Sequence, residues 1–343
     1  MSDTALAHGH GPKIVIAGAG SVGCFVGGLL ARGLHDVTFL MRSDKLEEIS
    51  RQGLMLSDYG DLDEELPPDS VHLTTDPASL ASADIILVSV KSGSTQDMAG
   101  HIARFAPKTA VVVSLQNGIK NVGVLRDALP NRDVRAGIVL FNVVSMGGGH
   151  FHRGTSGDIL IERGRGHISR TLSVADLEIH ERKRMRQLQL GKLLINLNNG
   201  LNALSGLPLK RQINEMRWRR LIAAQMSEAL RVLDAAGLEP VNPVSGTIPI
   251  SKMPSLLRLP TLLFRLAANI MVSIDPHARS SMWDDLKNGR STEIDELQGE
   301  IVSLAKAAGI QAPINQRVFE LIKQAEAIGA GSPHMNPKDV RGR

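Results

Sequence analysis

A run of glycines directly after the first apolar segment restricts how this chain can fold. Residues 13–17 read KIVIA, residues 18–23 read GAGSVG, and a helical pattern continues to Ala31. In such a strand–turn–helix unit the first glycine permits a tight turn, the second lets a phosphate approach the backbone, and the third lets the helix pack closely. The helix N-terminus adds amide donors for an anion. The alternative is a turn with only a structural role. We predict a dinucleotide-binding turn made of Gly18, Ala19, Gly20, Ser21, Val22 and Gly23.

Short, continuously apolar segments recur through the first half of the chain. They lie at residues 37–41, 84–90, 110–115, 136–144 and 158–162, and residues 53–75 read as an irregular hairpin insertion. Apolar strands that alternate with helices are typical of a parallel, doubly wound sheet covered on both faces.

Beyond about residue 180 only helical periodicity remains, as in residues 221–237 and 292–309. The predicted fold is therefore an α/β N-terminal Rossmann-type dinucleotide-binding domain followed by an all-α C-terminal domain. We expect the first domain at residues 12–180, the second at 181–330, and disordered tails at 1–11 and 331–343.

Composition narrows the classes of partner. The net charge is +4 and only 3% of the residues are aromatic, so stacking platforms for single-stranded nucleic acid are not expected. The apolar stretch 256–274 contains Arg258 and Arg265, which favours a buried or groove-lining helix over a membrane span. The single cysteine, Cys24, allows no intrachain disulfide, and the first residues lack the apolar core of a secretory leader. We expect a cytoplasmic protein without a nucleic-acid or membrane partner.

The end of the second predicted strand bears on the choice of cofactor. An acidic residue there would bind the ribose 2′-hydroxyl of NAD, whereas this chain has Met41 followed by Arg42. A guanidinium suits a 2′-phosphate, which favours NADP(H). The alternative is that Arg42 merely begins the next helix on the surface.

Two later strand ends also carry polar side chains. Lys91 follows the apolar segment at 84–90, and Asn117 with Gly118 follows the segment at 110–115. Because such sheets bind ligands at the carboxyl ends of their strands, Lys91 and Asn117 are candidate ligand contacts. Asn–Gly is also a common turn pair, so an ordinary loop remains the alternative.

An unusual polar row lies in the helical half, where residues 192–208 read KLLINLNNGLNALSGLP. On one helix Lys192 and Asn196 share a face, and Gly200 continues the row. The row is either the solvated side of an amphipathic helix or the wall of a polar site.

A second polar cluster lies in residues 279–295, RSSMWDDLKNGRSTEID. Ser281 is predicted to begin one helix and Glu293 to lie in the first turn of the next, with Thr292 and Asp295 in a capping arrangement. A carboxylate in a first turn is also favoured by the helix dipole alone, so composition and spacing leave the role of Glu293 open.

Together, GAGSVG, VSVKS, LQNG, KLLINLNNGLNALSG and SSM ahead of TEID resemble the ketopantoate reductase (2-dehydropantoate 2-reductase) family from about residue 13 to 325. The resemblance implies the two-domain fold above and NADPH-dependent reduction of ketopantoate to pantoate in pantothenate biosynthesis. It implies a small-molecule 2-keto acid substrate, and we predict a homodimer.

The resemblance also implies residue roles. Lys192 would be the catalytic proton donor, and Glu293 the acidic residue near both this lysine and the cofactor. Asn117 would contact nicotinamide and substrate, and Lys91 the cofactor. The implied substrate contacts are Asn196, Ser281 and, less directly, Asn199 and Gly200.

Some positions depart from the family pattern. Gly200 stands where many members have an asparagine, with Asn199 beside it, and a later substrate-binding asparagine falls at about Lys210. These departures leave hydride chemistry intact but open two alternatives: reduction of another 2-keto acid or an imine, and a non-catalytic NADP(H)-sensing module. No metal is expected, because the pairs His8/His10 and His150/His152 have no cysteine or acidic partner nearby in the sequence.

Overall fold

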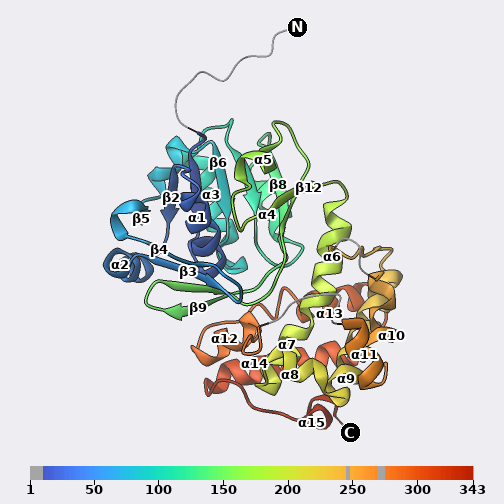
Figure 1. Ribbon diagram of the computed structural model, residues 1–343. Coiled ribbons are helices and arrows are strands. Elements are labelled where there is room, and N and C mark those ends of the chain that lie inside the picture. Colours follow the sequence, from blue (N-terminus) through green and yellow to red (C-terminus); the bar gives the residue numbers. More distant parts are fainter. Residues whose placement is uncertain (1–10, 245–247, 269–274, 343) are drawn as a thin grey trace.

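The computed structural model describes residues 11–244, 248–268 and 275–342. It has two parts, a sheet domain followed by a domain of helices, with α6 leading from one to the other (Figure 1). The predicted fold class is confirmed. The predicted tail at 1–11 falls almost wholly outside the described residues.

The sheet domain is built on an eight-stranded sheet in the order β12-β11-β8-β7-β6-β1-β2-β5. The six strands from β8 to β5 are parallel, as predicted, but β11 runs antiparallel to β8. No helix lies between β8 and β11 to carry the chain back across the sheet, so the returning strand runs in the opposite direction. The strands are β1 (Ile14–Ala17), β2 (Val37–Leu40), β5 (His72–Thr74), β6 (Ile85–Val88), β7 (Val111–Ser114), β8 (Val134–Val139), β11 (Ile159–Glu162) and β12 (Ile179–Arg182).

Each face of this sheet is covered by a different layer. In β1, Ile14 and Ile16 face α1 and a second sheet, whereas Val15 and Ala17 face α3 and α4, because side chains alternate along a strand. The helices are α1 (Ser21–Arg32), α2 (Ser43–Gln52), α3 (Thr95–Phe105), α4 (Asn121–Ala128) and α5 (Ile168–Leu172). The second sheet has the order β4-β3-β10-β9 and consists of β3 (Leu54–Asp58), β4 (Asp63–Leu66), β9 (Val143–Gly147) and β10 (His150–Arg153). The antiparallel β3–β4 pair is the hairpin predicted within residues 53–75.

The helical domain surrounds α9, against which α10, α13 and α14 pack. The buried Trp218 of α9 belongs to its core. The helices are α6 (Met185–Asn196), α7 (Asn198–Ser205), α8 (Leu209–Asn214), α9 (Met216–Ala235), α10 (Met253–Leu257), α11 (Thr261–Ala268), α12 (Ser281–Lys287), α13 (Gln298–Ala307), α14 (Pro313–Ile328) and α15 (Pro337–Arg341). Within the described ranges, no helix is long and apolar enough to cross a membrane.

Three local expectations need correction. The C-terminal residues 331–342 are not a disordered tail, because Val340 of α15 is buried in the helical core and the Met335 amide donates to the Leu204 carbonyl. The polar run at 192–208 is not one helix, since Leu197 separates α6 from α7. The stretch 256–274, predicted as a buried or groove-lining helix, is buried at Leu256, Leu257 and Phe264 but exposed along α11 at Leu262, Leu263 and Leu266, and its residues 269–274 lie outside the described residues.

Candidate active site

The glycine turn after β1 has the geometry that a bound pyrophosphate needs. Gly18 has φ +98°, and a Cβ there would lie 2.3 Å from a Val90 methyl. A Cβ on Gly23 would lie 2.5 Å from Ser89 Oγ, so this position sets the close approach of α1. A Cβ on Gly20 would meet nothing within 4 Å, and no side chain caps α1 at this residue. The turn formed by Gly18, Ala19, Gly20, Ser21, Val22 and Gly23 is therefore open at Gly20 and fits a dinucleotide.

Arg42 lies just after β2, at the N-terminus of α2. Its side chain is 84% exposed and its Nε lies 3.7 Å from Asp44 Oδ1. An exposed ion pair of this length is weak, so the guanidinium is available to a ligand.

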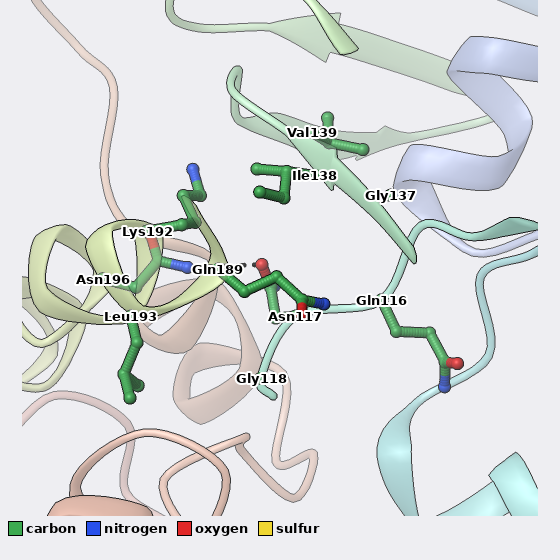
Figure 2. A pocket seen from close by; sticks show the side chains of 10 residues that line it. All are labelled: Gln116, Asn117, Gly118, Gly137, Ile138, Val139, Gln189, Lys192, Leu193 and Asn196. Carbon is green, nitrogen blue, oxygen red and sulfur yellow. Dashed lines mark hydrogen bonds between the residues drawn. The ribbon is translucent and has the colours of Figure 1, made fainter. Parts of the chain in front are cut away.

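The polar row of α6 faces a pocket between the two domains (Figure 2). Lys192 and Asn196 line it together with Leu193 and Gln189 of the same helix. The opposite wall comes from the ends of β7 and β8, with residues 116–118 and 137–139. The helix thus presents its polar row to the carboxyl ends of the strands.

Lys192 is half-buried as a residue, but its ammonium is buried and forms no ion pair with any residue that the structure describes. Burial lowers the pKa of Lys192 from 10.5 to about 8, because desolvation disfavours the charged form. A lysine with a pKa near neutrality can hold a proton and release it during a reaction.

A hydrogen-bond chain joins three predicted site residues across the domains. Asn196 Nδ2 donates to Asn117 Oδ1 at 3.2 Å, and Asn117 Nδ2 donates to a Glu293 carboxylate oxygen at 3.0 Å. Burial raises the pKa of Glu293, and the bond from Asn117 opposes part of this rise. The structure therefore brings Glu293 to Asn117 and not to the ammonium of Lys192.

Glu293 does not lie in the first turn of a helix, as was predicted. It precedes a turn, and α13 begins only at Gln298. Thr292 Oγ1 accepts from the Ile294 amide, and Ile294 is fully buried, so the segment after Thr292 folds inward before the helix starts. The capping arrangement of Thr292 with Asp295 is not formed.

Lys91 also connects the domains. Its Nζ donates to Asp285 Oδ1 at 2.9 Å and to the Ser291 carbonyl at 2.6 Å. Burial raises the pKa of Asp285, and the Lys91 ammonium opposes this rise.

Three predicted substrate residues, Asn199, Gly200 and Ser281, are not among the residues that line this pocket. Ser281 is the first residue of α12, where its neighbour Ser280 caps the helix and donates to the Asn199 carbonyl. A Cβ on Gly200 would lie 2.8 Å from a Val318 methyl and 3.0 Å from Gln298 Nε2, so Gly200 is a packing position.

Sequence reasoning missed two amides of the pocket, Gln116 and Gln189. Gln116 Nε2 donates to the Val90 carbonyl and to Thr95 Oγ1, and its Oε1 accepts from Ser114, which fixes the loop before Asn117. The position of Gln116 within LQNG, directly before Asn117, is the sequence feature that could have identified it. For Gln189 the signal was its spacing of three residues from Lys192.

No metal site was predicted, but the residues that the structure describes contain one cluster of possible metal ligands that the sequence did not indicate. Asp158, Glu178 and His180 present ligand atoms within 4.8 Å of one another at the surface. His152, by contrast, contacts Ser57 and Asp275, and His8 and His10 lie outside the described residues.

A glycine turn open to a phosphate, on the same sheet edge as a pocket whose lysine ammonium has no ion-pair partner among the described residues, is typical of an oxidoreductase that uses a nicotinamide cofactor. Two family models match the chain: Ketopantoate reductase PanE/ApbA over residues 14–166, and Ketopantoate reductase PanE/ApbA C terminal over residues 184–326. The chain belongs to the ketopantoate reductase family, which is a family of oxidoreductases.

Individual relatives agree with this assignment. A 2-dehydropantoate 2-reductase from Halobacterium salinarum is 27% identical over 326 residues, with 92% of this chain and 100% of the relative covered. The crystal structure of a PanE/ApbA family ketopantoate reductase from Ralstonia eutropha is 30% identical, with a TM-score of 0.76 and coverage of 92% and 99%. A complex of D-mandelate dehydrogenase with NADH shares the fold, with a TM-score of 0.72, 21% identity and coverage of 92% and 99%.

Proposed function

We propose that the protein reduces ketopantoate to pantoate with NADPH, as a cytoplasmic enzyme of pantothenate biosynthesis. The observation that carries the proposal is the buried Lys192 ammonium, which faces the pocket without a carboxylate partner among the described residues. Relatives named 2-dehydropantoate 2-reductase support the choice of substrate.

The bound cofactor would supply a hydride to the carbonyl carbon of the substrate. Lys192 would donate its proton to the carbonyl oxygen and stabilise the negative charge that develops there. Asn196 and Asn117 would orient the substrate, and Ser281 and Asn199 would reach it when the domains close. Glu293 acts through Asn117, whose amide it holds by a hydrogen bond.

The cofactor would lie over the glycine turn, with its pyrophosphate at Gly20, where the backbone is open. Lys91 lies just beyond β6, at the same edge of the sheet, and would contact it there. Arg42 would pair with the 2′-phosphate.

The direct test is an NADPH-oxidation assay with ketopantoate and a panel of other 2-keto acids. We expect a kcat/KM for ketopantoate at least about tenfold above that of any other panel member. Tight NADPH binding without turnover of any substrate would instead identify a cofactor-sensing module.

A second candidate is the reduction of another 2-keto acid. Gly200 packs against α13 and α14, and Lys210 of α8 is exposed, so two positions that are amides in many members add no amide to this pocket. A D-mandelate dehydrogenase shares the fold, and phenylglyoxylate therefore belongs in the panel. A preference for it over ketopantoate would decide for this candidate.

The choice of cofactor has its own test. Arg42→Ala should weaken NADPH binding about tenfold or more, because a charge-assisted contact is lost, and should leave NADH binding nearly unchanged. An equal loss for both cofactors would show that Arg42 does not contact the 2′-phosphate.

We also propose a homodimer in which the exposed leucines of α11, Leu262, Leu263 and Leu266, form part of the contact. Light scattering should then give a mass of twice 36.9 kDa, and Leu266→Glu should shift the protein toward the monomer.

A further inference from the structure

Gln189 is the amide of the pocket whose hydrogen-bonding capacity is unused. The side chain amides that line the pocket are those of Gln116, Asn117, Gln189 and Asn196. In Gln116 and Asn117 both the amide nitrogen and the amide oxygen already form hydrogen bonds, and Asn196 donates to Asn117. In the described part of the chain, the Gln189 side chain forms no hydrogen bond at all, although the residue is only 7% exposed.

The amide of Gln189 is nevertheless reached by solvent. Its nitrogen and oxygen are not among the fully buried side-chain atoms that lack a partner, so both keep some exposure, and the residue lines the pocket. A buried amide without a protein partner costs free energy unless water or a ligand satisfies it. Figure 2 shows the side chain extending from α6 toward the loop that carries Asn117 and Gln116.

The position of Gln189 points to the cofactor end of the pocket. It precedes Lys192 by three residues, about 4.5 Å along the helix axis, on the side of α6 whose Met185 and Leu188 pack into the sheet domain. The wall opposite is formed by the ends of β7 and β8. These strands lie two and three places from β1 in the sheet, or about 10 and 14 Å from the glycine turn at a spacing of about 4.8 Å. A dinucleotide whose pyrophosphate lies at that turn extends its nicotinamide half over these strand ends.

We propose that Gln189 binds the carboxamide of the nicotinamide ring. A primary carboxamide presents one acceptor oxygen and two N–H donors, which is the complement of a glutamine side chain. Residues 137–139, GIV, provide an apolar strand end against which a flat ring can lie. The pairing would fix the rotation of the ring and hence the face that carries the hydride. The inference rests on the proposed use of a nicotinamide cofactor.

The test is a binding cycle that needs no turnover. Calorimetry would measure the Kd of the reduced cofactor, NADPH or NADH, whichever the wild type prefers, and of its 3-acetylpyridine analogue, which keeps the carbonyl but lacks the N–H donors. The proteins are the wild type, Gln189→Met and the matched control Gln187→Met, whose side chain bonds to Glu239 at the surface. Methionine preserves the length of the side chain and removes both hydrogen-bonding ends.

We expect the wild type and Gln187→Met to bind the cofactor about three- to tenfold more tightly than the analogue, the usual effect of a neutral hydrogen bond. In Gln189→Met the Kd of the cofactor should rise by a similar factor, and the ratio of the analogue's Kd to the cofactor's Kd should fall to about one. The melting temperature of Gln189→Met should not fall, because the amide has no protein partner to lose.

Several results would overturn the inference. If Gln189→Met keeps the wild-type preference for the cofactor over the analogue, Gln189 does not bind the carboxamide, and the proposed function is unaffected. An increase in the KM of the keto acid with an unchanged cofactor Kd would assign Gln189 to the substrate instead. If the wild type binds neither NADPH nor NADH, the proposed function and this inference fail together.

Discussion

At the scale of single residues, the chemistry depends on one ammonium. Lys192→Ala should lower kcat by about a hundredfold or more, the usual range for the loss of a general acid. The Kd of the cofactor should change little, because its phosphates would lie at the glycine turn of the other domain. Lys192→Arg keeps the charge but releases no proton near neutral pH, so it should stay close to the alanine variant. A nearly normal kcat for Lys192→Ala would mean that the polar row has no catalytic role.

The pH dependence of the reaction follows from the same residue. Because the pKa of Lys192 is lowered to about 8, the proton-donating form predominates below this pH and disappears above it. The kcat for reduction should therefore be highest below pH 8 and decline as the pH rises through about 8. A pH–rate profile at saturating substrate would check this, and a rate that stays constant up to pH 10 would contradict it.

Sequence spacing could predict which residues share a helix face, but not which distant residues they contact. The interval of four residues placed Lys192 and Asn196 together, and both line the pocket. The partners of the Asn117 side chain, however, are 79 and 176 residues away along the chain. No local pattern encodes such contacts, so the link from Glu293 to Asn117 required the structure.

At the scale of elements, two glycines of the same turn should have different roles, Gly20 in cofactor binding and Gly23 in the stability of the fold. Gly20→Ala has an allowed φ of −81° and open space around it, so it should melt close to the wild type while weakening cofactor binding. Gly23→Ala would place a methyl 2.5 Å from Ser89 Oγ and 2.7 Å from the Gly18 carbonyl oxygen, so it should lower the melting temperature. Thermal melts and calorimetry on the two variants test this, and a Gly20→Ala protein with unchanged cofactor Kd would contradict the assignment of the turn.

Several elements could be predicted because local patterns specify them, but their ends and directions could not. The apolar runs marked β1, β2, β6 and β7 directly. The break at Leu197 could not be seen, because its carbonyl accepts from Gln298 Nε2 at 2.7 Å, a residue 101 positions away. The reversed direction of β11 likewise depends on how the chain returns to the sheet.

At the scale of the whole molecule, Asn117 and Glu293 join the two domains. If Glu293 acts by holding Asn117, then Glu293→Gln should retain most of the wild-type kcat/KM, since a glutamine oxygen still accepts from the amide. Glu293→Ala removes the acceptor and should lower kcat/KM by about tenfold. Steady-state kinetics would decide, and a large loss in Glu293→Gln would indicate that the negative charge itself is required.

The route of the chain through α6 determines which groups would travel together if the domains rotated (Figure 1). Met185 and Leu188 anchor the start of this helix in the sheet domain, while Leu193 and Leu194 enter the helical core. Because Leu193 and Leu194 are part of the helical core, a rotation of the helical domain would carry Lys192 and Ser281 together relative to the strand ends. Spin-label distances from β7 to α12 and from β7 to the end of α6 should then shorten together on ligand binding, and a change in only one of them would contradict this rotation. Closure of the domains would thus deliver the proton donor and the substrate contacts to the strand ends in a single movement.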